Sequence, residues 1–142
     1  MSDFQIKFKE RIPKRVLIAD DDPGITHLLT TILKQQQCEV VIANDGREAY
    51  RILQSDSRFK AAILDMNMPF LEGLDIIHYM RSERRLMRIP ILMISGEPNL
   101  DLMSESFSAG AIAFLPKPFT SEQLESAIRI LIGSPRQFRR AS

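Results

Sequence analysis

Three aspartates stand where they could bind a hard divalent cation. Asp20 and Asp21 directly follow a short apolar run, and Asp65 directly follows a second one. If the three carboxylates converge, their mutual repulsion requires a cation, and hard oxygen ligands favour Mg²⁺, with Mn²⁺ as an alternative. Taken alone, the adjacent acids Asp20, Asp21 and Asp22 can also form a solvated loop in which Asp22 caps a helix.

A hydroxyl and an ammonium group hold the corresponding positions after two further apolar runs. Ser95 ends the run that begins at Ile91, and Lys117 follows Leu115 and Pro116. Mg²⁺, a lysine and a hydroxyl together form the electrostatic clamp expected around the equatorial oxygens of a transferring phosphoryl group. No structural role is evident for Asp65, so we predict that it is the nucleophile and becomes an acyl phosphate.

The elements that must position these groups can be read from hydrophobic patterning. Five apolar runs alternate with five amphipathic stretches of helix length. The runs are short and mostly continuous, as in parallel strands buried on both faces. They are Val16–Ala19, Val40–Ala43, Ala61–Leu64, Ile91–Ile94 and Ala111–Leu115. The alternation predicts a doubly wound α/β fold, in which ligands bind at the carboxyl ends of the strands.

Capping residues support the predicted helix limits. Asp22 precedes Pro23, which places a capping side chain before a proline at the first helical position. Thr120 to Gln123 has the sequence of a capping box, which predicts the start of the last helix.

Length, charge and cysteine content bound the classes of protein that the chain can represent. Its 142 residues suit one domain. Residues 16–132 carry a net charge of −5, which argues against direct nucleic-acid binding. The single cysteine, Cys38, excludes an internal disulfide and a cysteine-rich zinc site. With no apolar leader and no run of 18 apolar residues, we expect a cytoplasmic protein without membrane contact.

Motifs in a fixed order resemble the receiver domain of two-component response regulators, including single-domain regulators of the chemotaxis type. The resemblance covers about residues 14–132, leaving an N-terminal extension (1–13) and a C-terminal tail or truncated linker (133–142). The motifs are Leu17-Ile18-Ala19-Asp20-Asp21-Asp22, Ile63-Leu64-Asp65-Met66-Asn67-Met68-Pro69 with Gly73, Met93-Ile94-Ser95-Gly96 and Leu115-Pro116-Lys117-Pro118-Phe119. The resemblance implies a flavodoxin-like parallel sheet of strand order 2-1-3-4-5 with five helices.

The resemblance also implies a role for each site residue. Asp65 matches the phosphoacceptor, Asp21 the direct metal ligand and Asp20 the ligand that holds metal-bound water. The backbone carbonyl of Asn67 completes the Mg²⁺ site in this family. Of the remaining positions, Lys117 matches the lysine that contacts the phosphoryl group, Ser95 the switch hydroxyl and Phe114 the switch aromatic, and the Lys117-Pro118 bond is expected to be cis.

The resemblance implies partners as well. The phosphoryl group is expected to come from a phosphohistidine on a sensor histidine kinase or a phosphotransfer protein. Phosphorylation adds negative charge near Lys117 and Ser95, which biases a bistable element. In this family that element is the face of the fourth helix, fifth strand and fifth helix, here about Leu100–Ala109, Ile112–Leu115 and Thr120–Ile132. Such domains dimerise there or engage an effector protein or output domain.

We expect a phosphorylatable receiver that is not an enzyme acting on other substrates. Two other functions compete with this interpretation. A Mg²⁺-dependent phosphohydrolase with an aspartate nucleophile uses a second aspartate two residues later as acid and base, and this chain has Asn67 there. A degenerate receiver acts as an adaptor without phosphorylation, but Asp20, Asp21, Asp65, Ser95 and Lys117 are all present. A stand-alone regulator and a receiver excised from a longer protein fit equally well.

Overall fold

A parallel sheet of five strands forms the centre of the computed structural model, which describes residues 14–97 and 99–133. The strands are β1 (Lys14–Ala19), β2 (Cys38–Ala43), β3 (Ala61–Asp65), β4 (Ile91–Ser95) and β5 (Ala113–Pro116). Each pairs in parallel with its neighbours in the order β2-β1-β3-β4-β5. The order confirms the doubly wound, flavodoxin-like sheet that the sequence predicts.

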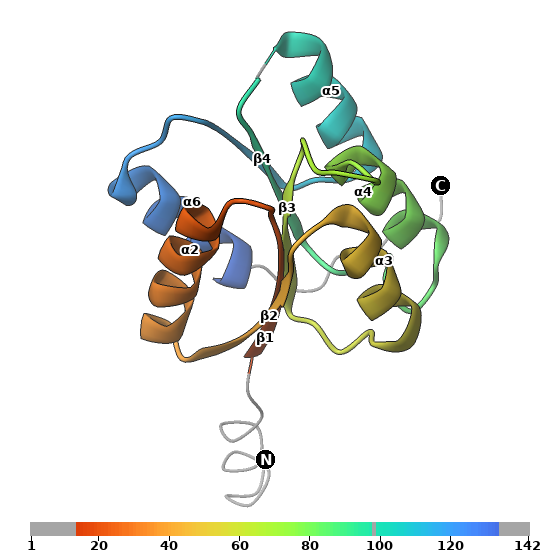
Figure 1. Cartoon of the computed structure of the whole chain (residues 1–142), viewed down its shortest axis with the longest axis horizontal. Coiled ribbons are helices and arrows are strands. Elements are labelled where there is room, and N and C mark those ends of the chain that lie inside the picture. Colours follow the sequence, from red (N-terminus) through yellow and green to blue (C-terminus); the bar gives the residue numbers. More distant parts are fainter. Residues whose placement is uncertain (1–13, 98, 134–142) are drawn as a thin grey trace, which may run out of the picture.

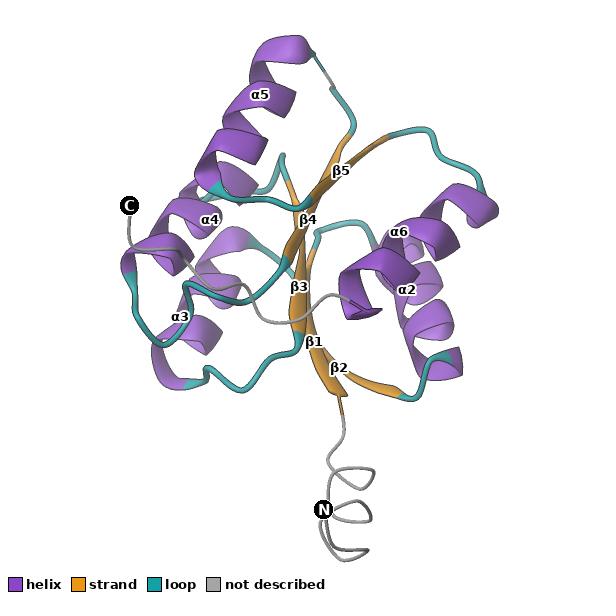
Figure 2. Cartoon of the chain, turned by 180° about the vertical axis from the view of Figure 1, so that it is seen from behind, coloured by secondary structure: helices purple, strands orange, loops and turns teal. Residues whose placement is uncertain are grey.

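Five helices of the described residues cover the two faces of the sheet (Figure 1). They are α2 (Pro23–Gln35), α3 (Gly46–Ser55), α4 (Gly73–Ser82), α5 (Leu100–Ala109) and α6 (Ser121–Gly133). Helices α2 and α6 lie on one face, and α3, α4 and α5 lie on the other, as the view from behind also shows (Figure 2). Across this described part of the chain, no helix has the length and apolar character that crossing a membrane requires.

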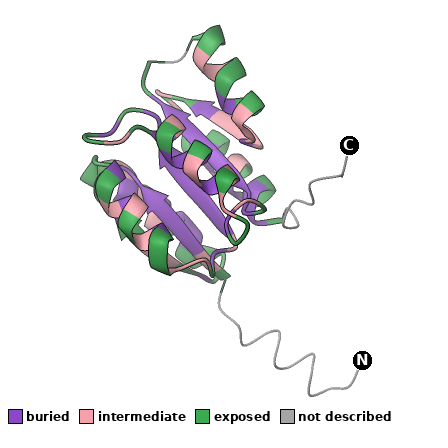
Figure 3. Ribbon diagram, turned by 90° about the vertical axis from the view of Figure 1, so that its right-hand side faces the viewer, coloured by how far each residue is buried: buried purple, intermediate pink, exposed green. Residues whose placement is uncertain are grey.

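Alternation along each strand divides the core between the two helical layers. In β1, Val16 and Ile18 join the cluster formed with α2 and α6, whereas Leu17 and Ala19 join the cluster formed with α3 and α4. Successive side chains of a strand point to opposite faces, so a sheet covered on both faces needs apolar residues at every position. The central strands β3 and β4 are therefore buried throughout, the edge strands β2 and β5 are partly exposed, and the outer sides of the helices are exposed (Figure 3).

Two predicted helix starts are confirmed by hydrogen bonds. The carboxylate of Asp22 accepts from the N–H of Gly24 at 2.8 Å, immediately before α2. Thr120 and Gln123 exchange hydrogen bonds of 3.1 and 2.9 Å between side chain and backbone, which is the predicted capping box before α6.

The fifth strand is shorter than its apolar run. It begins at Ala113 rather than at Ala111, because the residues before it close the end of α5. The N–H of Gly110 donates to Phe107, and the N–H of Ala111 donates to Ser106, both at 3.0 Å. Gly110 has φ +113°, a left-handed conformation that glycine adopts without cost.

The predicted extension (1–13) and all but the first residue of the predicted tail (133–142) lie outside the described residues. The domain limits of 14 and 132 therefore stay predictions.

Candidate functional site

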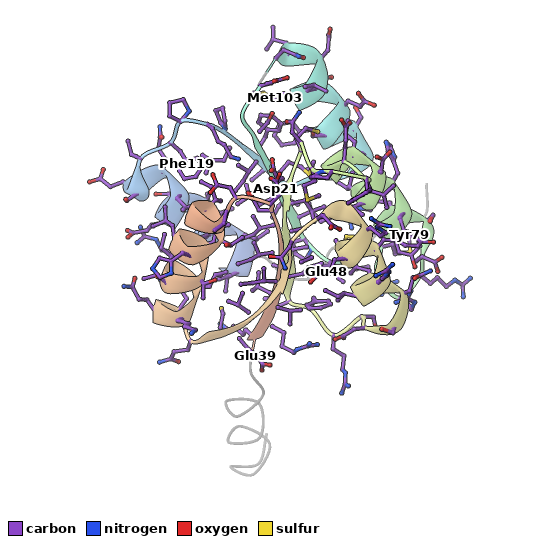
Figure 4. The ribbon with its side chains drawn as sticks, in the orientation of Figure 1. Asp21, Glu39, Glu48, Tyr79, Met103 and Phe119 are labelled. Atoms are coloured by element: carbon purple, nitrogen blue, oxygen red, sulfur yellow. The ribbon has the colours of Figure 1, made fainter. Side chains whose placement is uncertain are left out.

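The predicted site residues meet at the carboxyl edge of the sheet. Asp65 and Ser95 are the last residues of β3 and β4, Asp20 directly follows β1, and Lys117 directly follows β5. Figure 4 labels Asp21 near the middle of the view and Glu39, near the start of β2, below it at the lower edge of the sheet. Because the strands are parallel and in register, the order of the sheet brings these four strand-end positions to one edge.

Three carboxylates converge at this edge. One oxygen from each of Asp20, Asp21 and Asp65 lies within 4.8 Å of the others. Asp20 and Asp65 are only 2% and 3% exposed, whereas Asp21 is exposed. Such a set of hard oxygen ligands, part buried and part open to water, suits Mg²⁺, which usually keeps several of its waters.

The two oxygens of Asp20 have different surroundings. Oδ1 accepts a hydrogen bond of 2.8 Å from the N–H of Asp22. Oδ2 is buried and has no hydrogen-bond partner among the described residues. A buried carboxylate oxygen without a donor costs free energy, so it marks a place where a cation fits. The donor set and this orphaned atom agree with a divalent metal site.

The pKa of Asp65 is raised to about 6, first by burial and next by the charge of nearby Asp20. The N–H of Asn67, which donates to Asp65 Oδ1 at 3.2 Å, and the Lys117 ammonium oppose this rise. Burial is also the main cause of a raised pKa at Asp20. The site therefore holds two carboxyls whose ionised forms are disfavoured until positive charge arrives.

Lys117 supplies part of that charge. Its Nζ lies 3.9 Å from Asp20 Oδ2 and 3.9 Å from Asp65 Oδ1. Its backbone N–H donates to the carbonyl of Ser95 at 2.7 Å, which ties the end of β5 to the end of β4. The Lys117–Pro118 peptide bond is cis, the isomer that the resemblance implies.

Ser95 and Asn67 complete the surroundings of the cluster. Ser95 is fully buried, and its Oγ accepts from the N–H of Glu97 at 3.2 Å. A pocket of about 500 Å³ opens over the carboxylates. Its lining residues are Asp21, Asp22, Asp65, Asn67, Gly96, Glu97 and Lys117. The lining carries four carboxylates and one ammonium, which suits a cation better than an apolar ligand.

The loop between β3 and α4 is held close to the cluster by Gly73. A Cβ on Gly73 would lie 2.5 Å from the carbonyl oxygen of Asp65, so only glycine allows this approach. The Gly73 N–H donates to the Met66 carbonyl at 3.0 Å. The sequence motif includes Gly73, but its role follows only from the close approach of α4 to the end of β3.

Phe114 lies on β5, is half-buried and packs against the core layer that includes α5. It is absent from the pocket lining.

Comparisons with known proteins identify the family of the chain. The model of the response regulator receiver domain family matches residues 16–129. Response regulator MprA of Mycolicibacterium vanbaalenii is 36% identical over 121 residues, which cover 85% of this chain and 51% of MprA. Chemotaxis protein CheY1 of Helicobacter pylori is 31% identical over 121 residues, which cover 84% of this chain and 98% of CheY1. The chain thus spans about half the length of MprA and nearly all of CheY1.

A solved structure of chemotaxis protein CheY4 of Vibrio cholerae has the same fold. It superposes with a TM-score of 0.76 at 32% identity, covering 84% of this chain and 99% of CheY4. The match extends over nearly all of the described sheet and helices and favours neither a phosphohydrolase nor a degenerate adaptor. With the family model matching most of its length, the chain belongs to the response regulator receiver domain family and has that family's phosphoacceptor role in signal transduction.

Proposed function

We propose that Asp65 accepts a phosphoryl group from a phosphohistidine, with Mg²⁺ held by Asp20, Asp21, Asp65 and the backbone carbonyl of Asn67. The observation that carries this proposal is the convergence of three carboxylates on one ammonium group, with one buried carboxylate oxygen left without a donor. Asp21 and Asp65 supply direct ligands, whereas Asp20 holds metal-bound water. Mn²⁺ has the same ligand preference and is the natural substitute.

In the transfer step, a carboxylate oxygen of Asp65 forms a bond to phosphorus while the bond from phosphorus to the donor imidazole breaks. The imidazole nitrogen keeps the bonding electron pair and takes up a proton from solvent. Asp65 is then an acyl phosphate. Attack of water on phosphorus later releases inorganic phosphate and regenerates the carboxylate.

Lys117 and Ser95 act on the oxygens of the transferring group. The Lys117 ammonium lies between Asp20 and Asp65 and stabilises negative charge that develops beside Asp65. Ser95 offers a buried hydroxyl from the end of the next strand. When bound, Mg²⁺ neutralises charge on the phosphoryl oxygens and on the carboxylates around them. The chain thus catalyses only its own phosphorylation and dephosphorylation.

Phosphorylation at Asp65 changes the contacts of Ser95 and Lys117, the groups nearest α5 and β5. We expect the change to reach a face made by α5, β5 and α6, with Ser95 and Phe114 as its switch residues. Three large apolar side chains of this face are exposed, namely Leu100 (82%), Ile130 (61%) and Phe107 (46%). Exposed apolar side chains on the two helices that flank β5 support an interaction surface there.

A groove on the same face lies between β5 and α6. Its volume is about 640 Å³. Its lining residues are Ala113, Phe114, Leu115, Thr120, Glu122, Gln123, Ser126, Ala127 and Ile130. We assign this face to an effector protein, an output domain or a second copy of the chain. The donor, a sensor histidine kinase or a phosphotransfer protein, instead approaches the carboxyl edge of the sheet. The cytoplasmic location stays a prediction.

The test is the intact mass of the protein after incubation with acetyl phosphate and Mg²⁺. We expect a gain of about 80 Da, the mass of one phosphoryl group in an acyl phosphate. The gain should be lost in Asp65→Ala and after chelation with EDTA. An adduct that survives in Asp65→Ala would contradict the assignment of Asp65, and one that survives EDTA would contradict the role of the metal.

A further inference from the structure

The loop that carries Asn67 contains a strained turn. The N–H of Leu71 donates to the carbonyl of Pro69 at 2.9 Å, and Phe70 between them has φ +72°. This combination defines a γ-turn with a positive φ at its centre, which is rare and strained. Glycine or asparagine adopts such a φ readily, but a bulky aromatic residue does not. The Phe70 side chain is also 68% exposed, so burial does not offset the strain.

Arg47 contacts the ring of Phe70. Its guanidinium carbon lies 3.8 Å from the ring centroid, the geometry of a cation–π pair. Arg47 is the second residue of α3, where the helix dipole disfavours a positive charge. Both partners therefore occupy positions that are unfavourable locally. A contact made from two such residues indicates a function beyond the stability of either element.

The backbone of α3 contacts the same loop. A Cβ on Gly46 would lie 1.8 Å from the carbonyl oxygen of Leu71, so the first turn of α3 touches the loop directly. The start of α3 is itself fixed, because the Asp45 carboxylate accepts from the N–H of Glu48 at 2.8 Å. Arg47 thus extends from an anchored helix end and holds the strained turn from one side.

The turn lies three residues after Asn67, whose N–H donates to Asp65 Oδ1 at 3.2 Å. On the other side of the turn, Gly73 packs against the Asp65 carbonyl. A shift of the turn would therefore move Asn67 relative to the carboxylates. We propose that Arg47 and Phe70 are positioning residues that hold the Asn67 carbonyl in place for a divalent cation and so set the affinity of the site for Mg²⁺. The inference rests on the proposed function, in which that carbonyl is a ligand.

The experiment is a thermal-unfolding titration with MgCl₂, since a ligand that binds the folded state raises Tm according to its Kd. Arg47→Gln is the main variant because the loss of charge and the loss of positioning predict opposite changes in Mg²⁺ affinity. Loss of a positive charge by itself should strengthen cation binding through electrostatics. Loss of the positioning contact should weaken it, by about two- to fivefold in Kd.

Matched variants separate position from charge. Arg51→Gln removes the same charge from the exposed side of the same helix one turn later, and it should leave the Mg²⁺ affinity unchanged or slightly higher. Phe70→Asn removes the ring but accepts the positive φ, so Tm without metal should not fall while the affinity does. Phe70→Tyr should restore the wild-type affinity. The double variant Arg47→Gln/Phe70→Asn should weaken binding no more than either single variant.

Asp21→Asn distinguishes failure of the inference from failure of the proposed function. If Asp21→Asn abolishes the Mg²⁺ response while Arg47→Gln and Phe70→Asn bind as tightly as the wild type or more tightly, the positioning inference alone is overturned. If Asp21→Asn keeps the wild-type response, the proposed metal site is wrong. Reduced affinity in both contact variants, with normal behaviour of Arg51→Gln, supports the inference.

Discussion

Asp56, near the amino ends of the strands, and Asp65, at their carboxyl ends, are aspartates beside a basic side chain, yet their electrostatic surroundings are opposite. Asp56 makes two contacts with the Arg15 guanidinium, of 2.9 and 3.0 Å, and accepts the N–H of Arg58 at 3.0 Å. Its pKa is lowered, first by the hydrogen bond from Arg15. Asp65 has a pKa raised to about 6, first by burial.

Asp56 has the surroundings of a carboxylate that stabilises the fold, whereas Asp65 has the surroundings of one that takes part in chemistry. At the amino end, charge and hydrogen bonds are matched, and the Arg15 guanidinium also lies 4.8 Å from the centroid of the Phe59 ring. At the carboxyl end, Asp20 and Asp65 share one ammonium at 3.9 Å and remain short of positive charge. In the function that we propose, a divalent cation makes up this deficit.

The largest effect should come from removing the shared ammonium. Lys117→Ala should slow formation of the acyl phosphate from acetyl phosphate by about 100-fold, because a preorganised group that stabilises the transition state is lost. Intact mass followed over time measures the rate. Lys34→Ala, a lysine in the last turn of α2, is the control and should react as the wild type does. A Lys117→Ala rate close to that of the control would contradict the assigned role.

A smaller effect, on the free energy of unfolding, should be a gain for a substitution at Asp65 and a loss for one at Asp56. In EDTA at about pH 7.5, Asp65→Asn should raise the free energy of unfolding by about 1–3 kcal/mol, since it removes a buried charge whose ionised form is disfavoured. Because the folded pKa of about 6 lies above the ordinary value of 3.8, neutral Asp65 stabilises the wild type below pH 3.8, and this stabilisation is lost as pH rises through about 6. The advantage of the variant should therefore grow over that interval. Denaturant unfolding at a series of pH values measures it, and a destabilised variant at neutral pH would contradict the account.

The smallest effect should come from the Arg15–Asp56 ion pair. Asp56→Asn should lower the free energy of unfolding by about 0.5–1 kcal/mol at neutral pH, as expected for a partly exposed ion pair. The pKa of Asp56 is lowered, so the stability from the pair is present above pH 3.8 and is lost as pH falls through the lower folded value. Added salt should reduce the difference. If the variant gained stability at neutral pH, the contrast between the two ends would disappear.

The strands and the site residues at their ends could be predicted because each leaves a local signal, whereas the order of the sheet is what the family resemblance implies. Ala61 to Leu64 forms a continuous apolar run that ends in a carboxylate, and an acid placed there has few structural explanations. Parallel topology then brings Asp20, Asp65, Ser95 and Lys117 to one edge without any knowledge of side-chain contacts.

The contacts that support the site left no such signal. Arg47 and Phe70 are distant in sequence, and their contact depends on how closely α3 approaches the loop after β3. Arg81 lies in the last turn of α4. In the structure its guanidinium donates to the carbonyls of Met87, Ile89 and Gly110 at 2.8 to 3.0 Å. Such tertiary contacts depend on the spacing of whole elements, which local patterns do not encode.

The most direct test of the central claim is the identity of the phosphorylated residue. Borohydride reduces an aspartyl phosphate to homoserine, and peptide mass analysis then locates the change. After treatment with acetyl phosphate and Mg²⁺, we expect homoserine at position 65 and aspartate at positions 20 and 21. Homoserine at position 20 or 21, or no conversion at position 65 in a protein that carries the phosphoryl mass, would contradict the account.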